Sequence, residues 1–191
     1  MSTQPWTSGS PMTEPALNYI PLDVAAMMRI QAFRVWTISS LVVFAWVLLI
    51  VGVPVAKANG FATVSSPLHY FFSFICHQIP DRSLHITGEP FAVCSRCFGI
   101  YFGLLFGFLI YPLWRNIEEI EPLSRFWLFL SLIPISLDWS LTFFRLWQNT
   151  HLSRSLTGMI VGVACSTFII PSLVDITRNF SYRKRISTQS R

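Results

Sequence analysis

Charged residues are scarce in this chain. Asp, Glu, Lys and Arg make up only 12% of its 191 residues, whereas hydrophobic residues make up 52%. A soluble domain carries about 25% charged residues, so the composition excludes an ordinary soluble globular protein. It favours a protein whose main solvent is the lipid bilayer.

Long stretches with few or no charges recur along the chain, and each reaches the length of about 18 residues that is typical of a membrane-spanning helix. They predict an all-α integral membrane bundle of four transmembrane helices, with spans at about 35–56, 97–114, 126–147 and 155–174. The apolar and aromatic residues 68–75 are too few to cross a bilayer. They predict a short interfacial helix before the cysteine-rich loop at 76–97.

The two ends of the chain differ in composition from this transmembrane domain, which we place at 23–176. Residues 1–22 are predicted to be a disordered tail, because they are rich in polar residues and proline. Residues 177–191 form a basic tail with five of the fourteen Lys and Arg residues, and we expect this tail to contact anionic lipid headgroups. The other basic residues are dispersed, which argues against a nucleic-acid partner. A protein partner or a homo-oligomer is compatible with the sequence.

Glycines recur every four residues in the second and fourth spans. Gly99, Gly103 and Gly107 place three positions without side chains on one face of a helix, and Gly158 and Gly162 do the same in the fourth span. Small residues let helix backbones approach closely inside a membrane. We therefore expect the second and fourth spans to pack against each other.

Prolines and a glycine interrupt the segment between residues 79 and 93. Pro80, Gly88 and Pro90 all oppose regular structure, so this segment is predicted to be an irregular loop.

The distribution of positive charge predicts the orientation in the cell membrane. With four spans, both termini and the turn after the second span share one side, which holds nine Lys and Arg residues against five on the other side. The positive-inside tendency places the termini in the cytoplasm and the cysteine loop outside.

Cysteine is also rare, but three of the four cysteines lie in this loop. The spacing Cys94-x-x-Cys97 lets two thiolates bind one metal ion, and Cys76 with His77, or with His85 as an alternative ligand, completes a Cys3His set for zinc or another transition metal. The Cys-x-x-Cys pair occurs once, which excludes a complete zinc ribbon with two such pairs.

Two other chemistries suit the same cysteines. Cys97 lies at the start of a predicted helix, where the helix dipole favours a thiolate, so Cys94 and Cys97 with Cys76 as resolving thiol are also typical of a membrane thiol-disulfide oxidoreductase. In a loop outside the cytoplasm, a permanent structural disulfide is equally compatible with the sequence. The sequence alone leaves these alternatives open.

One carboxylate, Asp138, lies within the third span. A charge in a span usually pairs with another charge or marks an ion path. We expect a structural pair with Arg145, Arg154 or Arg82, and the alternative is a small transporter or channel that uses Asp138. The residues expected to form a polar wall opposite the cysteines are Arg82, Arg96, Asp138, Arg145 and Arg154.

The polar motifs resemble those of an uncharacterised family of small prokaryotic multi-pass membrane proteins, a domain of unknown function. The resemblance covers about 35–174 and rests on Cys76-His77-Gln78, Pro80, Arg82-Ser83, Cys94-x-Arg96-Cys97-x-Gly99-Ile100-Tyr101-x-Gly103, Asp138 and Arg154-x-x-Thr157-Gly158. It implies a shared membrane fold and a shared cysteine-histidine site, without an established reaction or ligand.

Overall fold

A computed structural model describes residues 22–189, with side chains up to Tyr182. The predicted disordered tail at 1–22 lies outside the described residues except for Leu22. The elements in chain order are α1 (Leu22–Ala58), α2 (Ala62–Ser73), the short 3-10 helix η1 (Pro80–Arg82), β1 (Ser83–Ile86), β2 (Glu89–Cys94), α3 (Ser95–Trp114), α4 (Arg125–Phe143) and α5 (His151–Gln189).

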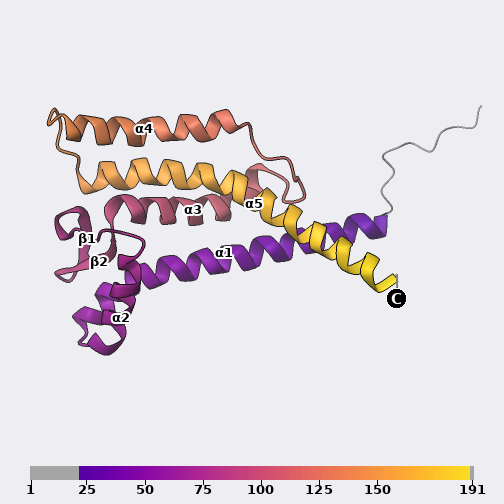
Figure 1. Cartoon of the computed structure of the whole chain (residues 1–191), viewed down its shortest axis with the longest axis horizontal. Coiled ribbons are helices and arrows are strands. Elements are labelled where there is room, and N and C mark those ends of the chain that lie inside the picture. The colour runs from indigo at the N-terminus through magenta and orange to yellow at the C-terminus, as the bar shows by residue number, and fades with distance from the viewer. Residues whose placement is uncertain (1–21, 190–191) are drawn as a thin grey trace, which may run out of the picture.

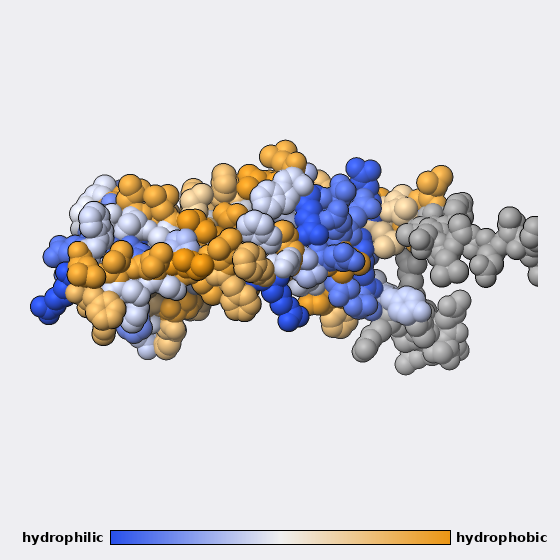
Figure 2. Space-filling model, turned by 90° about the horizontal axis from the view of Figure 1, so that it is seen from above, coloured by the Kyte–Doolittle hydropathy of each residue, from blue (hydrophilic) through white to orange (hydrophobic). Residues whose placement is uncertain are grey.

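Four of these helices are long and apolar enough to cross a membrane. The membrane-spanning segments are Leu22–Ala58, Ser95–Trp114, Arg125–Phe143 and His151–Tyr182. In Figure 1 they lie side by side in the order α1, α3, α5, α4, with the hairpin and α2 at one end of the bundle. Figure 2 shows hydrophobic surface along the helices and hydrophilic surface towards their ends. The predicted all-α membrane bundle with a short helix before the cysteine loop is confirmed.

Helices α3 and α5 form the closest pair in the bundle, because glycines remove the side chains between them. A Cβ atom on Gly99 or Gly103 would overlap the backbone of α5 at Ser155 or Met159, and a Cβ on Gly162 would overlap the Ile100 carbonyl. The predicted contact between the two glycine faces is therefore confirmed. By contrast, only 6% of the 18-residue apolar stretch of α4 is buried. This helix therefore contacts the rest of the bundle mainly along one side, where it packs against α5.

The segment after α2 is not the irregular loop that the prolines predicted. It forms η1 and an antiparallel hairpin in which Ile86 pairs with Glu89 and His85 pairs with Pro90. Thr87 and Gly88 connect the strands with φ values of 52° and 83°, which suit a two-residue turn of type I′. Pro90 is tolerated because a two-stranded sheet leaves an outer edge where no N–H is needed.

The end of α1 fixes the direction in which the chain enters α2. At the end of α1, the amides of Gly60 and Phe61 donate to the carbonyls of Lys57 and Ala56, and Gly60 has a φ of 80°. This is a Schellman motif, which stops the helix and turns the chain into α2. Helix α2 begins at Ala62, six residues before the interfacial helix predicted at 68–75.

Candidate functional site

Three elements bring the cysteines together at the end of the bundle. Cys76 follows α2, Cys94 ends β2 and caps α3, and Cys97 lies in the first turn of α3. A hydrophobic cluster from α1, α2 and β2 supports them, and it includes Ile50, Phe72 and the buried Cys76. The cysteines therefore lie on a packed wall rather than on a free loop.

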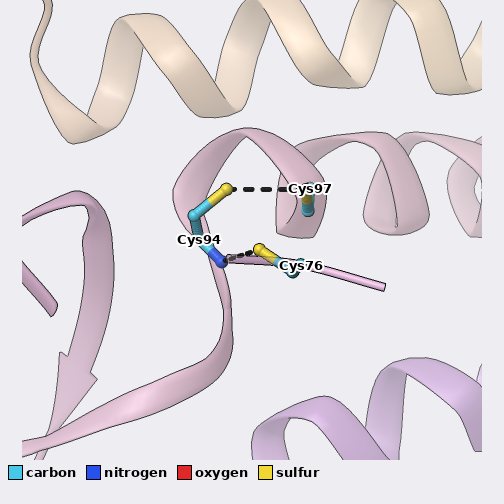
Figure 3. A group of neighbouring side chains, drawn as sticks. All are labelled: Cys76, Cys94 and Cys97. Carbon is cyan, nitrogen blue, oxygen red and sulfur yellow. Dashed lines mark hydrogen bonds between the residues drawn. The ribbon is translucent and has the colours of Figure 1, made fainter. Parts of the chain in front are cut away.

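The three sulfur atoms all lie within 4.8 Å of one another. The Sγ atoms of Cys94 and Cys97 are 3.5 Å apart, and the amide of Cys94 donates to the Cys76 Sγ at 3.2 Å (Figure 3). Two thiolates on one tetrahedral zinc ion, each at about 2.3 Å, would be about 3.8 Å apart, whereas a disulfide has a length of about 2.05 Å. In the described part of the chain the cysteines are free thiols at a spacing that suits metal ligation.

Cys76 is the thiol most favoured to lose its proton. Hydrogen bonds from the thiols of Cys94 and Cys97 lower its pKa well below the ordinary value, and bonds from the backbone amides of Cys94 and Gln78 add to this, although burial acts in the opposite direction. A metal binds cysteine as the thiolate. The surroundings of Cys76 thus prepare it as a ligand.

The two histidines predicted as further ligands lie outside this group of sulfur atoms. His77 and His85 are both exposed, and the cluster of possible ligand atoms among the described residues contains only the three cysteines. His85 lies on β1 between the half-buried Leu84 and Ile86, and its own side chain is exposed. The described geometry therefore offers three sulfur ligands.

Side chains that tie the hairpin to the helices fix the position of the cysteines. The Gln78 amide donates to the carbonyls of His69 and Ala92 at 2.7 and 2.8 Å, which links α2 to β2. Lys57 at the end of α1 forms an ion pair with Glu89 on β2 at 2.6 Å. These contacts join β2, the strand that leads to Cys94, to both α1 and α2.

On the other side of the first turn of α3, Arg96 pairs with Asp138 of α4 at 2.5 Å. The partner of Asp138 is therefore Arg96, and not Arg145, Arg154 or Arg82 as we expected. Asn149 and Ser153 also donate to this carboxylate, at 2.9 and 3.0 Å. Asp138 is only 9% exposed, so these bonds replace the water that the carboxylate loses.

The remaining arginines of the predicted polar wall differ in their surroundings. Arg154 donates to the Asn149 amide oxygen at 2.7 Å and so joins the Asp138 network. Arg82 is exposed on η1, and its carbonyl accepts a hydrogen bond from the Ser95 hydroxyl at 2.8 Å. Arg145 is exposed and ends α4 with a φ of 57°, which is the left-handed position of a Schellman motif.

The bonds from Asn149 and Ser153 to Asp138 were not predicted from the sequence. Neither was the contact between the side chains of Ser95 and His151, which are 2.8 Å apart. All four residues belong to short connections or first helical turns. The signal that could have found them is the polar connector after the third span, which leads back towards Asp138. Ser95 is the first residue of α3, and Cys94 occupies the N-cap position before it.

The chain was compared with known proteins. The family described as Predicted membrane protein (DUF2085) matches residues 76–168. An uncharacterised protein of Methanocaldococcus jannaschii is 36% identical over 114 residues, which cover 60% of this chain and 73% of that protein. An uncharacterised protein of Methanothermobacter thermautotrophicus is 30% identical over 109 residues, 54% of this chain and 93% of that protein. The chain belongs to the DUF2085 family.

The part matched by DUF2085 begins at Cys76, and it contains the three clustered cysteines, Asp138 and Arg154. The resemblance seen in the sequence is thereby confirmed at the level of the family. No solved structure matches the chain. The DUF2085 description places the protein in a membrane and assigns no chemistry to it.

Proposed function

We propose that this membrane protein binds one transition metal ion, most simply zinc, through the thiolates of Cys76, Cys94 and Cys97. The observation that carries the proposal is the grouping of three free thiols within 4.8 Å of one another. Thiolates are ligands for zinc and other soft ions. Three protein ligands leave the fourth position of a tetrahedral ion for water or another group, as in zinc sites that act on a ligand.

The surroundings of the cysteines support this chemistry. The cluster rests on buried residues of the hydrophobic core, such as Phe72 and Val93, and an apolar shell limits the access of water to a metal site. Tyr101 packs against the same core and contacts Trp46 with a ring distance of 5.9 Å. A bound ion would therefore be fixed between α2, β2 and α3.

Elemental analysis of the purified full-length protein tests the proposal. We expect about one equivalent of metal, as purified or after reduction and addition of zinc. Cys94→Ser should lose it, whereas Cys165→Ser should keep it, because Cys165 lies within α5 and outside the cluster. The proposal fails if the reduced wild-type protein takes up no metal.

A thiol-disulfide oxidoreductase is the second candidate, and the partial exposure of Cys94 and Cys97 favours it. A thiolate of this pair would attack the disulfide of a partner protein, forming a mixed disulfide and releasing one partner thiolate. The second cysteine would then displace the other partner sulfur and close a Cys94–Cys97 disulfide. Serine at the second position should trap the mixed disulfide; if neither Cys94→Ser nor Cys97→Ser traps any partner, this function is excluded.

We further propose that the cysteine cluster faces the outside of the cell and that both termini are cytoplasmic. Nine Lys and Arg residues on the side of the termini against five on the other side support this orientation. In this orientation the site would exchange its ligand with the extracytoplasmic space.

A further inference from the structure

The proposed metal site does not use the arginines on the far side of α3. Arg96 is next to Cys97 in sequence, but successive helical residues are about 100° apart around the axis, and its side chain reaches α4 while the cysteines face the hairpin. Arg96, Arg154 of α5 and Arg82 of η1 form what we call the arginine cluster.

Positive charge is in excess in this cluster. The charged groups that act on the Arg154 guanidinium are Arg82 and Arg96, which repel it, and Asp138 and Cys94, which attract it. The cluster thus contains three guanidinium groups and one carboxylate, which is paired with Arg96, and a Cys94 thiolate would still leave net positive charge. Like charges at close range are unfavourable unless an anion lies between them.

Hydrogen-bond donors are also in excess. Arg96 uses one terminal nitrogen for Asp138, and its Nε is buried without a hydrogen-bond partner among the described residues. Arg154 uses its Nε for Asn149, which leaves its two terminal nitrogens available. A buried donor without a partner costs free energy, so the Arg96 Nε favours a ligand that accepts a hydrogen bond there, and the half-buried Arg154 can donate further bonds to the same ligand.

The helix backbones are closely packed around the cluster. A Cβ atom on Gly158 would overlap the Arg96 carbonyl, so α3 and α5 are in direct backbone contact at this level. The N-terminal ends of α3 and α5 both point to this end of the bundle (Figure 1), and helix N-termini add positive potential. This end of the spans is where the headgroups of a bilayer lie.

From these features we infer that the arginine cluster binds a phosphate group, carried by a membrane phospholipid or by a free phosphate compound. Guanidinium groups bind phosphate oxygens in pairs of parallel hydrogen bonds. The site uses none of the three thiols as a ligand and does not depend on a bound metal.

Two measurements on purified, delipidated full-length protein distinguish the sources. Calorimetry with inorganic phosphate tests the free anion. Native mass spectrometry compares phosphatidylglycerol with diacylglycerol of the same acyl chains, which lacks the phosphate. We expect binding in at least one arm, and about tenfold weaker binding in Arg82→Gln and Arg154→Gln, because each loses a cation and its paired donors.

Arg145→Gln is the matched control, because Arg145 is exposed at the same end of the bundle and outside the Asp138 network. It should bind as the wild type does. If Arg154→Gln does not fold, the exposed Arg82 decides the question. The inference is overturned if the wild type binds neither phosphate nor the phospholipid in preference to diacylglycerol, or if Arg82→Gln binds as tightly as Arg145→Gln. Metal content measured on the same samples shows separately whether the thiol site is intact.

Discussion

At the scale of single residues, the first turn of α3 separates two kinds of chemistry. Cys94 and Cys97 face a thiol on the chain that leaves α2, whereas Arg96 between them reaches a carboxylate on α4. Sequence spacing was sufficient to predict that Cys94 and Cys97 lie close together, because a Cys-x-x-Cys pair is local. It could not select the partner of Asp138 among several arginines, because that choice depends on how three helices pack.

The lowered pKa of Cys76 leads to a prediction for the metal-free, reduced protein. An unfolded cysteine has a pKa of about 8.5, and hydrogen bonds from the neighbouring thiols lower the pKa of Cys76 in the folded state. The Cys76 thiolate should therefore persist below pH 8.5 in the folded protein. Its contribution to the free energy of unfolding should be complete above pH 8.5 and should be lost as the pH falls through the pKa of the folded state.

Ultraviolet absorbance of the thiolate, followed as the pH is lowered, measures this effect. Cys165→Ser should titrate as the wild type does, whereas Cys76→Ser should lose the signal at neutral pH. A wild-type thiolate signal that disappears around pH 8.5, as in the unfolded chain, would contradict the prediction.

Asp138→Asn should destabilise the protein by about 3 kcal/mol. The substitution removes the charge partner of Arg96 in a place where the Asp138 side chain is 9% exposed, and breaking one side of a buried pair leaves an uncompensated charge. Thermal unfolding in detergent measures the change. Asp175→Asn is the control, because Asp175 accepts one exposed hydrogen bond, from Asn179; equal effects of the two substitutions would show that the Arg96 pair contributes no stability.

At the scale of elements, glycine positions decide how α3 and α5 pack. Their four-residue spacing was visible in the sequence, and the contact it predicted is present. The hairpin was not predicted, because Pro90 and Gly88 within it, and Pro80 just before it, are equally typical of a loop. What makes it regular is the positive φ of both Thr87 and Gly88, and threonine gives no sign of that conformation.

Gly103→Ala should separate α3 from α5 and destabilise the bundle by about 1–3 kcal/mol, the usual cost of excess volume in a packed interior. The added methyl group would overlap the backbone of Met159, whereas a Cβ on Gly52 of α1 meets nothing within 4 Å. Gly52→Ala should therefore be neutral or stabilising, because alanine favours the helix. The comparison of the two melting temperatures is the test, and a smaller loss for Gly103→Ala than for Gly52→Ala would contradict the packing.

At the scale of the whole molecule, both described ends of the chain lie at the end of the bundle opposite the hairpin (Figure 1). The number of spans followed from composition, because hydrophobic length is a local property of the sequence. The positions of the thiols and the arginine cluster on different sides of α3 could not be predicted from composition, because they depend on the rotation of α3 about its axis.

Thiol labelling from each side of intact membranes checks the proposed orientation. In Cys165→Ser, a membrane-impermeant reagent added outside should modify Cys94 or Cys97 after reduction and chelation, since both are partly exposed. The same reagent should not modify them when it is added to the cytoplasmic side of inverted vesicles. Modification from the cytoplasmic side alone would reverse the orientation.

The position of the cysteines in the chain also sets an order of assembly during synthesis. Cys76, Cys94 and Cys97 all precede the last residue of α3, Trp114, so every sulfur ligand is present once the first two spans have entered the membrane. The Arg96 and Asp138 pair needs α4, and the bond from Arg154 needs α5. A nascent chain would thus possess all three clustered thiols while Arg96 still lacks its counter-charge, and the later helices complete the arginine side.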